Sequence, residues 1–150
     1  MTPQTSLSLS TADLKFLARF EAQELSVEEW THQAHLRVAL AYLASRSFDE
    51  AYDCVRRGIQ ALNLSHGRTV GYHEALTMAY MTVIHSALEN GSNHWGSCDQ
   101  FLATHDTIAG SGFAAIRPYY SMDHLKTDAA RDTFVQPDLV PLPAVGKTDT

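Results

Sequence analysis

The sequence is poor in several features that would point to particular classes of protein. It has only two cysteines, Cys54 and Cys98, without C-x-x-C spacing, so a disulfide framework is not expected and free thiols suit a reducing compartment. The longest apolar run, residues 38–44, is too short to cross a bilayer, and residues 1–5 do not begin a signal peptide. We therefore expect a cytoplasmic protein with no membrane partner.

Basic residues are also few. The 150 residues include 11 Lys and Arg against 17 Asp and Glu, which gives a formal net charge of −6. The basic residues are spread along the chain, whereas binding to the phosphates of nucleic acid requires them to cluster. We therefore expect no nucleic-acid partner.

Helical periodicity is the main feature that the sequence does contain. No segment alternates in the manner of a strand, and S-x-x-[EQ] capping boxes at Ser26, Ser47 and Ser97 predict three helix starts. Thr11, Thr69 and Thr127 are further candidate caps. We expect a first helix that begins at Thr11 and three longer helices over about 26–44, 48–65 and 69–88. A short helix after residue 97, a turn at 121–125 and a last helix at 128–135 follow.

The spacing of these segments predicts an all-α fold, an irregular four- to six-helix bundle with short C-terminal helices. Prolines 137, 141 and 143 keep the tail extended, and apolar residues between them favour packing of the tail on the body. We expect a flexible arm over residues 1–10, a single helical domain over 11–143 and a loose C-terminus over 144–150.

Three histidines lie at positions that predict burial. His32 and His35 are three residues apart on the helix expected at 26–44, and from His32 the positions i+4 and i+7 are Leu36 and Ala39. His73 begins a second apolar stripe that continues through Thr77, Tyr80, Ile84 and Leu88. A buried imidazole left without a hydrogen-bond partner costs about 1–3 kcal/mol, so three of them favour a functional role.

The first hypothesis is a small metal-dependent enzyme: a hydrolase, a lyase or an oxygenase. Three protein ligands and an open position are typical of catalytic metal sites, and His32, His35 and His73 would be those ligands. Zinc, iron, nickel and copper all accept imidazole, so the ligands do not select among them. The metal would activate water or a substrate oxygen.

Four further residues are candidates for catalysis or substrate binding in that enzyme. Glu74 would transfer protons, while Tyr42, Tyr80 and Arg131 would position a small polar or anionic molecule. Each has a structural alternative: Glu74 can satisfy the helix dipole, the tyrosines can be core residues, and Arg131 can pair with Asp128.

Two interpretations without a metal remain open. The protein can be a binding module, as a monomer or a homodimer, whose histidines and tyrosines line a small-molecule pocket. Alternatively, the histidines are hydrogen-bonded core residues of a structural protein. Glu29 and His32 also form an E-x-x-H pair typical of di-iron bundles, but no second copy is found and Glu29 is the acid of a capping box.

Four motifs resemble those of a group of small uncharacterised bacterial helical proteins. They are W-T-H-x-A-H-L at 30–36, G-Y-H-E at 71–74, Y-Y-S at 119–121 and A-R-x-x-F-V-x-P-D-L-x-P-L at 130–142. The resemblance covers residues from about 30 to 143 and implies a shared fold, a bacterial cytoplasmic setting and a tail that belongs to the domain. It implies no reaction, because that group has no established activity.

Overall fold

The computed structural model describes residues 7–68, 72–90, 94–110 and 112–145. Within these ranges it contains eight helices and no strand beyond an isolated bridge between Leu7 and Trp95, so the predicted all-α class is confirmed. The helices are α1 (Thr11–Glu21), α2 (His32–Ser45), α3 (Phe48–Ser65), α4 (Glu74–Asn90), α5 (Cys98–Ala103), α6 (Asp106–Ala109), α7 (Met122–Leu125) and α8 (Asp128–Asp132).

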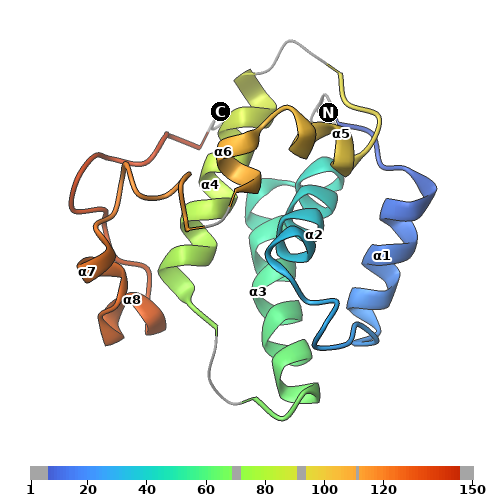
Figure 1. Cartoon of the computed structure of the whole chain (residues 1–150), viewed down its shortest axis with the longest axis horizontal. Coiled ribbons are helices and arrows are strands. Elements are labelled where there is room, and N and C mark those ends of the chain that lie inside the picture. The colour runs from blue at the N-terminus through green and yellow to red at the C-terminus, as the bar shows by residue number, and fades with distance from the viewer. Residues whose placement is uncertain (1–6, 69–71, 91–93, 111, 146–150) are drawn as a thin grey trace.

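Helix α2 is the centre of the fold, because it contacts α1, α3, α4, α5 and α6. Figure 1 shows α1 on one side of α2 and α3, and the α7–α8 pair on the opposite side of the molecule, next to α4. The middle of α2 is buried almost completely, with Val38, Leu40 and Ala41 at most 1% exposed. No helix in the described ranges is long and apolar enough to cross a membrane.

The C-terminal segment packs against α4 through a second, smaller core of Ala79, Ile116, Tyr120 and Leu125. The Tyr120 hydroxyl donates to the Val135 carbonyl at 2.6 Å, and the Leu139 N–H donates to the Tyr119 carbonyl at 3.0 Å. These bonds place the tail beside residues 119–120. The side chains of Leu139 and Val140 nevertheless remain exposed.

Some helix starts agree with the sequence and others are shifted. α3 begins after Ser47 with the predicted capping box, and Gly67 ends it in the left-handed conformation at φ 75. α1 is capped by Ser10 rather than Thr11, because Ser10 and Asp13 form a reciprocal box of their own. The predicted cap Thr69 lies outside the described residues.

The capping box at Ser26 forms a turn and not a helix, so the predicted helix start at residue 26 is wrong. Ser26 and Glu29 form the two reciprocal hydrogen bonds, but the chain becomes extended at Thr31, which caps α2 through the Ala34 N–H. Glu29 also accepts two 2.8 Å hydrogen bonds from Arg19, which help to lower its pKa to about 2. Trp30 consequently lies outside the helix that it was expected to join.

Other boundaries differ at the ends of the chain. The last helix keeps its Thr127 cap but ends at Asp132 instead of 135, and the one-turn helix α6 was not expected. Of the expected N-terminal arm, residues 1–6 lie outside the described ranges. Leu7 is buried and the Ser8 N–H donates to the Trp95 carbonyl at 2.8 Å, so residues 7–8 are attached to the body. Of the expected loose C-terminus, residues 146–150 are not described.

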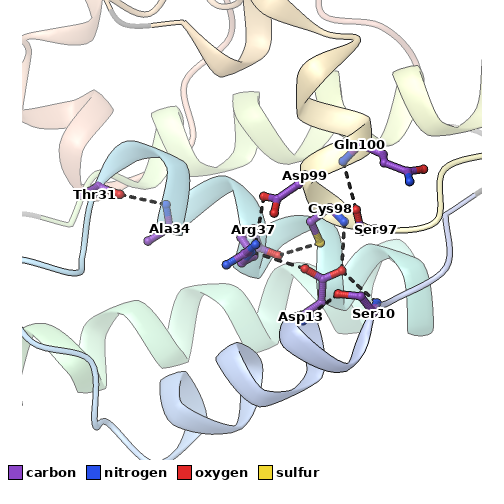
Figure 2. A network of polar contacts seen from close by, with 9 residues as sticks. All are labelled: Ser10, Asp13, Thr31, Ala34, Arg37, Ser97, Cys98, Asp99 and Gln100. Carbon is purple, nitrogen blue, oxygen red and sulfur yellow. Dashed lines mark hydrogen bonds and ion pairs between the residues drawn. The ribbon is translucent and has the colours of Figure 1, made fainter.

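A buried carboxylate joins three of the helices (Figure 2). Asp13, in the first turn of α1, is completely buried and accepts hydrogen bonds from the N–H groups of Ser10 and Cys98, both at 3.0 Å. Its other oxygen lies 3.4 Å from Nε of Arg37 on α2, and Arg37 also pairs with Asp99 on α5 at 2.9 Å. Asp13 thereby fixes α1 and the start of α5 against α2.

Asp13 stays ionised in this setting. Burial by itself raises the pKa of the carboxyl group, but the hydrogen bonds from Cys98 and Ser10 and the charge of Arg37 outweigh it, so the net pKa is lowered from 3.8. Because the folded-state pKa lies below the unfolded one, the stabilisation is present above pH 3.8 and is lost as the pH falls through the folded pKa.

We predict that Asp13→Asn lowers the free energy of unfolding by about 2–3 kcal/mol at neutral pH, because the N–H groups of Ser10 and Cys98 and the buried face of Arg37 lose the negative charge that they surround. Asp99→Asn is the matched control: it removes a partner of the same Arg37, but its side chain is 75% exposed, so a change near zero is expected. Urea unfolding measures both. Equal losses in the two variants would contradict the role given to Asp13.

Candidate functional site

A cavity of about 300 Å³ lies between α2, α3 and α4. Its wall is mostly aliphatic and aromatic, and its polar members are two histidines, a threonine and a tyrosine. The lining residues are His32, His35, Leu36 and Ala39 from α2, Val55 and Ile59 from α3, Leu76, Thr77, Tyr80, Met81 and Ile84 from α4, and Phe113. No Asp, Glu, Lys or Arg is among them.

Phe113 reaches the cavity from a strained backbone. Its φ of 59 is in the left-handed region, which an aromatic residue adopts at a cost of about 1–2 kcal/mol. The side chain also packs beside the smaller core around Ile116 and Tyr120. Phe113 therefore closes one side of the cavity at the price of local strain, a combination often found at binding sites.

His32 occupies the first position of α2 and is half-buried. Its Nε2 lies 3.2 Å from the carbonyl oxygen of Ile108 on α6, and because a carbonyl only accepts, Nε2 must carry the proton. The imidazole ring meets the Tyr80 ring edge-on, with centroids 5.4 Å apart. These two contacts fix the orientation of the ring at the cavity wall.

His35 lies one turn further along α2 and is held equally firmly. Its Nδ1 donates to the Thr31 carbonyl at 2.7 Å, and its ring stacks on Trp30 with centroids 3.8 Å apart. Burial is the main reason why the pKa of His35 is lowered from 6.5, with a smaller effect from His32. His35 is therefore a neutral imidazole at pH 7.

Tyr80 contributes its ring and a buried hydroxyl to this region of α4. The hydroxyl has no hydrogen-bond partner among the described residues. Burial raises the pKa of Tyr80 to about 12, so the group remains a neutral O–H at physiological pH. A buried hydroxyl without a partner costs about 1–3 kcal/mol, which Tyr80→Phe would relieve in the folded state.

His73, the third predicted ligand, lies apart from His32 and His35. It precedes α4 instead of lying in the first turn, and its Nδ1 accepts the Leu76 N–H at 3.0 Å. Its Nε2 lies 2.7 Å from the carbonyl oxygen of Leu125 and donates to it. Both ring nitrogens are thus occupied, and His73 joins the start of α4 to α7 without lining the cavity.

The three histidines do not form a ligand set in this arrangement. Among the described residues, no group of three or more His, Cys, Asp or Glu side chains is placed to hold a metal ion. The Nδ1 lone pair of His73 is engaged with a backbone N–H, and its Nε2 carries a proton. The structure therefore does not bring these three side chains together, and the three-histidine metal centre stays a prediction.

The four other predicted site residues lie in different places. Tyr80 lines the cavity, whereas the Tyr42 hydroxyl donates to Glu21 at 2.7 Å on the α1 side of α2. Glu74 is the first residue of α4, where partial burial raises its pKa, and it is not in the cavity wall. Arg131 is exposed and pairs with Asp128 at 2.9 Å, so it does not reach the histidines.

Sequence reasoning missed part of the wall. Leu36, Ala39, Thr77 and Ile84 follow the histidine stripes and were indicated by helical spacing. Phe113 follows a glycine turn and carries no periodic signal. The Ile108 carbonyl that orients His32 belongs to α6, and no side-chain pattern can point to a backbone oxygen 76 positions away.

In comparisons with known proteins, no family model, no curated protein and no solved structure matches the chain. The resemblance to small uncharacterised bacterial proteins therefore stays a prediction.

We predict that His35→Phe flattens the pH dependence of stability between pH 7 and 5. In the wild type the unfolded chain takes up the proton near pH 6.5 and the folded protein only at lower pH, so stability falls as the pH drops below 6.5. Phenylalanine keeps a ring against Trp30 but does not titrate. Urea unfolding at several pH values measures the slopes, and identical slopes in both proteins would contradict a buried neutral His35.

Proposed function

We propose that the protein is a small-molecule binding module and that the cavity between α2, α3 and α4 takes up an uncharged, largely apolar molecule without a metal ion. The observation that carries the proposal is the cavity itself, an apolar space of about 300 Å³ with a few fixed polar groups. Ligand sites typically start at about this volume and have this kind of lining.

The absence of charge in the wall supports an uncharged ligand over an anionic one. No Lys or Arg lines the cavity, and Arg131, the predicted anion-binding residue, is paired with Asp128 at the surface. An unpaired ion in an apolar cavity costs several kcal/mol. A neutral molecule with an apolar body avoids that cost and gains from burial of its surface.

The fixed rings support a preformed site. His32 is held by the Ile108 carbonyl, and His35 is held by the Thr31 carbonyl and the Trp30 ring. Side chains that are already oriented lose little conformational entropy when a ligand binds. We also propose a reducing setting such as the cytoplasm, in keeping with Cys54 and Cys98, which are both free thiols.

Binding is tested with a library of neutral fragments and the variant Ala39→Leu. Ala39 lines the cavity, so leucine fills part of it and should weaken every cavity ligand at least roughly tenfold, while stability is kept or raised. The control Ala103→Leu makes the same change on an exposed residue of α5 and should bind as the wild type does. Calorimetry measures the affinities. Unchanged binding to Ala39→Leu would place the ligands elsewhere.

The metal-dependent enzyme stays a prediction with a direct test. Under our proposal, elemental analysis of untagged protein purified without a chelator gives far less than one zinc, iron, nickel or copper per chain. It should give the same result for His73→Ala, because the ring of His73 bonds to Leu76 and Leu125. About one metal per chain in the wild type, lost in His73→Ala and His32→Ala, would overturn the proposal and restore the three-histidine site.

A further inference from the structure

We infer that the ligand of the cavity carries a neutral hydrogen-bond donor, a hydroxyl or an N–H group, which donates to the unprotonated nitrogen of His32 or of His35. The inference rests on the proposed function, since it concerns the same cavity. It concerns which part of an otherwise apolar ligand is recognised, and by which atoms.

The tautomer of each ring follows from its carbonyl partner. Nε2 of His32 donates to Ile108 and Nδ1 of His35 donates to Thr31, because neither carbonyl can donate in return. In the neutral rings the remaining atoms, Nδ1 of His32 and Nε2 of His35, each carry a lone pair. Neither atom has a hydrogen-bond partner in the described part of the chain.

The rings cannot exchange these roles freely. Rotating either ring by 180° would break its bond to the carbonyl, and for His35 the stacked Trp30 ring restricts other rotations. The free nitrogens therefore remain acceptors when a ligand arrives. Both histidines line the cavity, and in each ring the unprotonated nitrogen is the polar atom that remains for a ligand.

The other polar groups in the wall, the hydroxyls of Thr77 and Tyr80, leave the preference for a hydrogen-bond donor on the ligand unchanged. The Thr77 hydroxyl already donates to the His73 carbonyl at 2.8 Å, and it keeps only acceptor capacity. The Tyr80 hydroxyl can donate, but its oxygen atom is buried and is not exposed to the open space. The wall thus offers mainly acceptors, which a donor on the ligand satisfies. An ammonium group would also donate, but an apolar cavity disfavours a cation.

Matched pairs of neutral probes test the inference on the wild-type protein. Phenol and toluene have nearly the same shape, but toluene has a methyl group in place of the hydroxyl. Indole and benzofuran are likewise matched, with a ring oxygen in benzofuran in place of the N–H. If the histidines accept a donor, phenol and indole bind roughly two- to tenfold more tightly than their partners, the range for one neutral hydrogen bond. Calorimetry gives the four dissociation constants.

The outcomes separate this inference from the proposed function. Binding of both members of each pair with equal affinity would retain the cavity as a binding site and overturn the role of the histidines. Failure of all four probes to bind would overturn both. The double variant His32→Phe/His35→Phe should still bind toluene and benzofuran but lose the preference for phenol and indole. A preference kept in that variant would contradict the inference.

A measurement on the wild-type protein tests the inference without depending on the folding of the double variant. The ¹⁵N resonances of histidine report which ring nitrogen is protonated, and an unprotonated nitrogen moves upfield when it accepts a hydrogen bond. Saturation with indole should move Nδ1 of His32 or Nε2 of His35, whereas benzofuran should leave both in place. Binding of indole with no shift at either nitrogen would overturn the inference.

Discussion

The buried carboxylate of Asp13 is the interaction on which the arrangement of the helices depends most. It accepts hydrogen bonds from the N–H groups of Ser10, the cap of α1, and of Cys98 at the start of α5, and it lies beside Arg37 of α2. α1, α2 and α5 therefore meet at one charged group (Figure 2). α6 follows α5 after two residues, and its Ile108 carbonyl accepts a hydrogen bond from His32 Nε2. The polar network and the cavity are therefore connected through α5 and α6.

Backbone carbonyls decide the chemistry of the cavity. His32, His35 and His73 each donate one ring N–H to a main-chain oxygen, and these oxygens belong to three different segments. For His73 the second nitrogen is also hydrogen-bonded, whereas His32 and His35 each keep one lone pair. The surrounding backbone thus sets which ring nitrogens remain free.

The sequence predicted the helical class, the caps at Ser47, Ser97 and Thr127, and the stripes that carry His32 and Tyr80, because each depends on residues a few positions apart. Two features could not be read from local spacing. The box at Ser26 predicted a helix start, but Thr31, five residues later, offers a second cap and the chain is extended there. The ring of His73 is held by the carbonyl of Leu125, 52 positions away, and the apolar stripe of its helix gives no sign of that contact.

A small molecule bound in the space between α2, α3 and α4 would lie against the methyl groups of its wall. Intermolecular nuclear Overhauser effects between indole and the protein's methyl groups measure this contact. We expect contacts with the methyls of Ala39, Met81 and Ile84, all in the cavity wall. Contacts confined to the exposed side chains of Leu139 and Val140, or none at saturating indole, would contradict binding in that space.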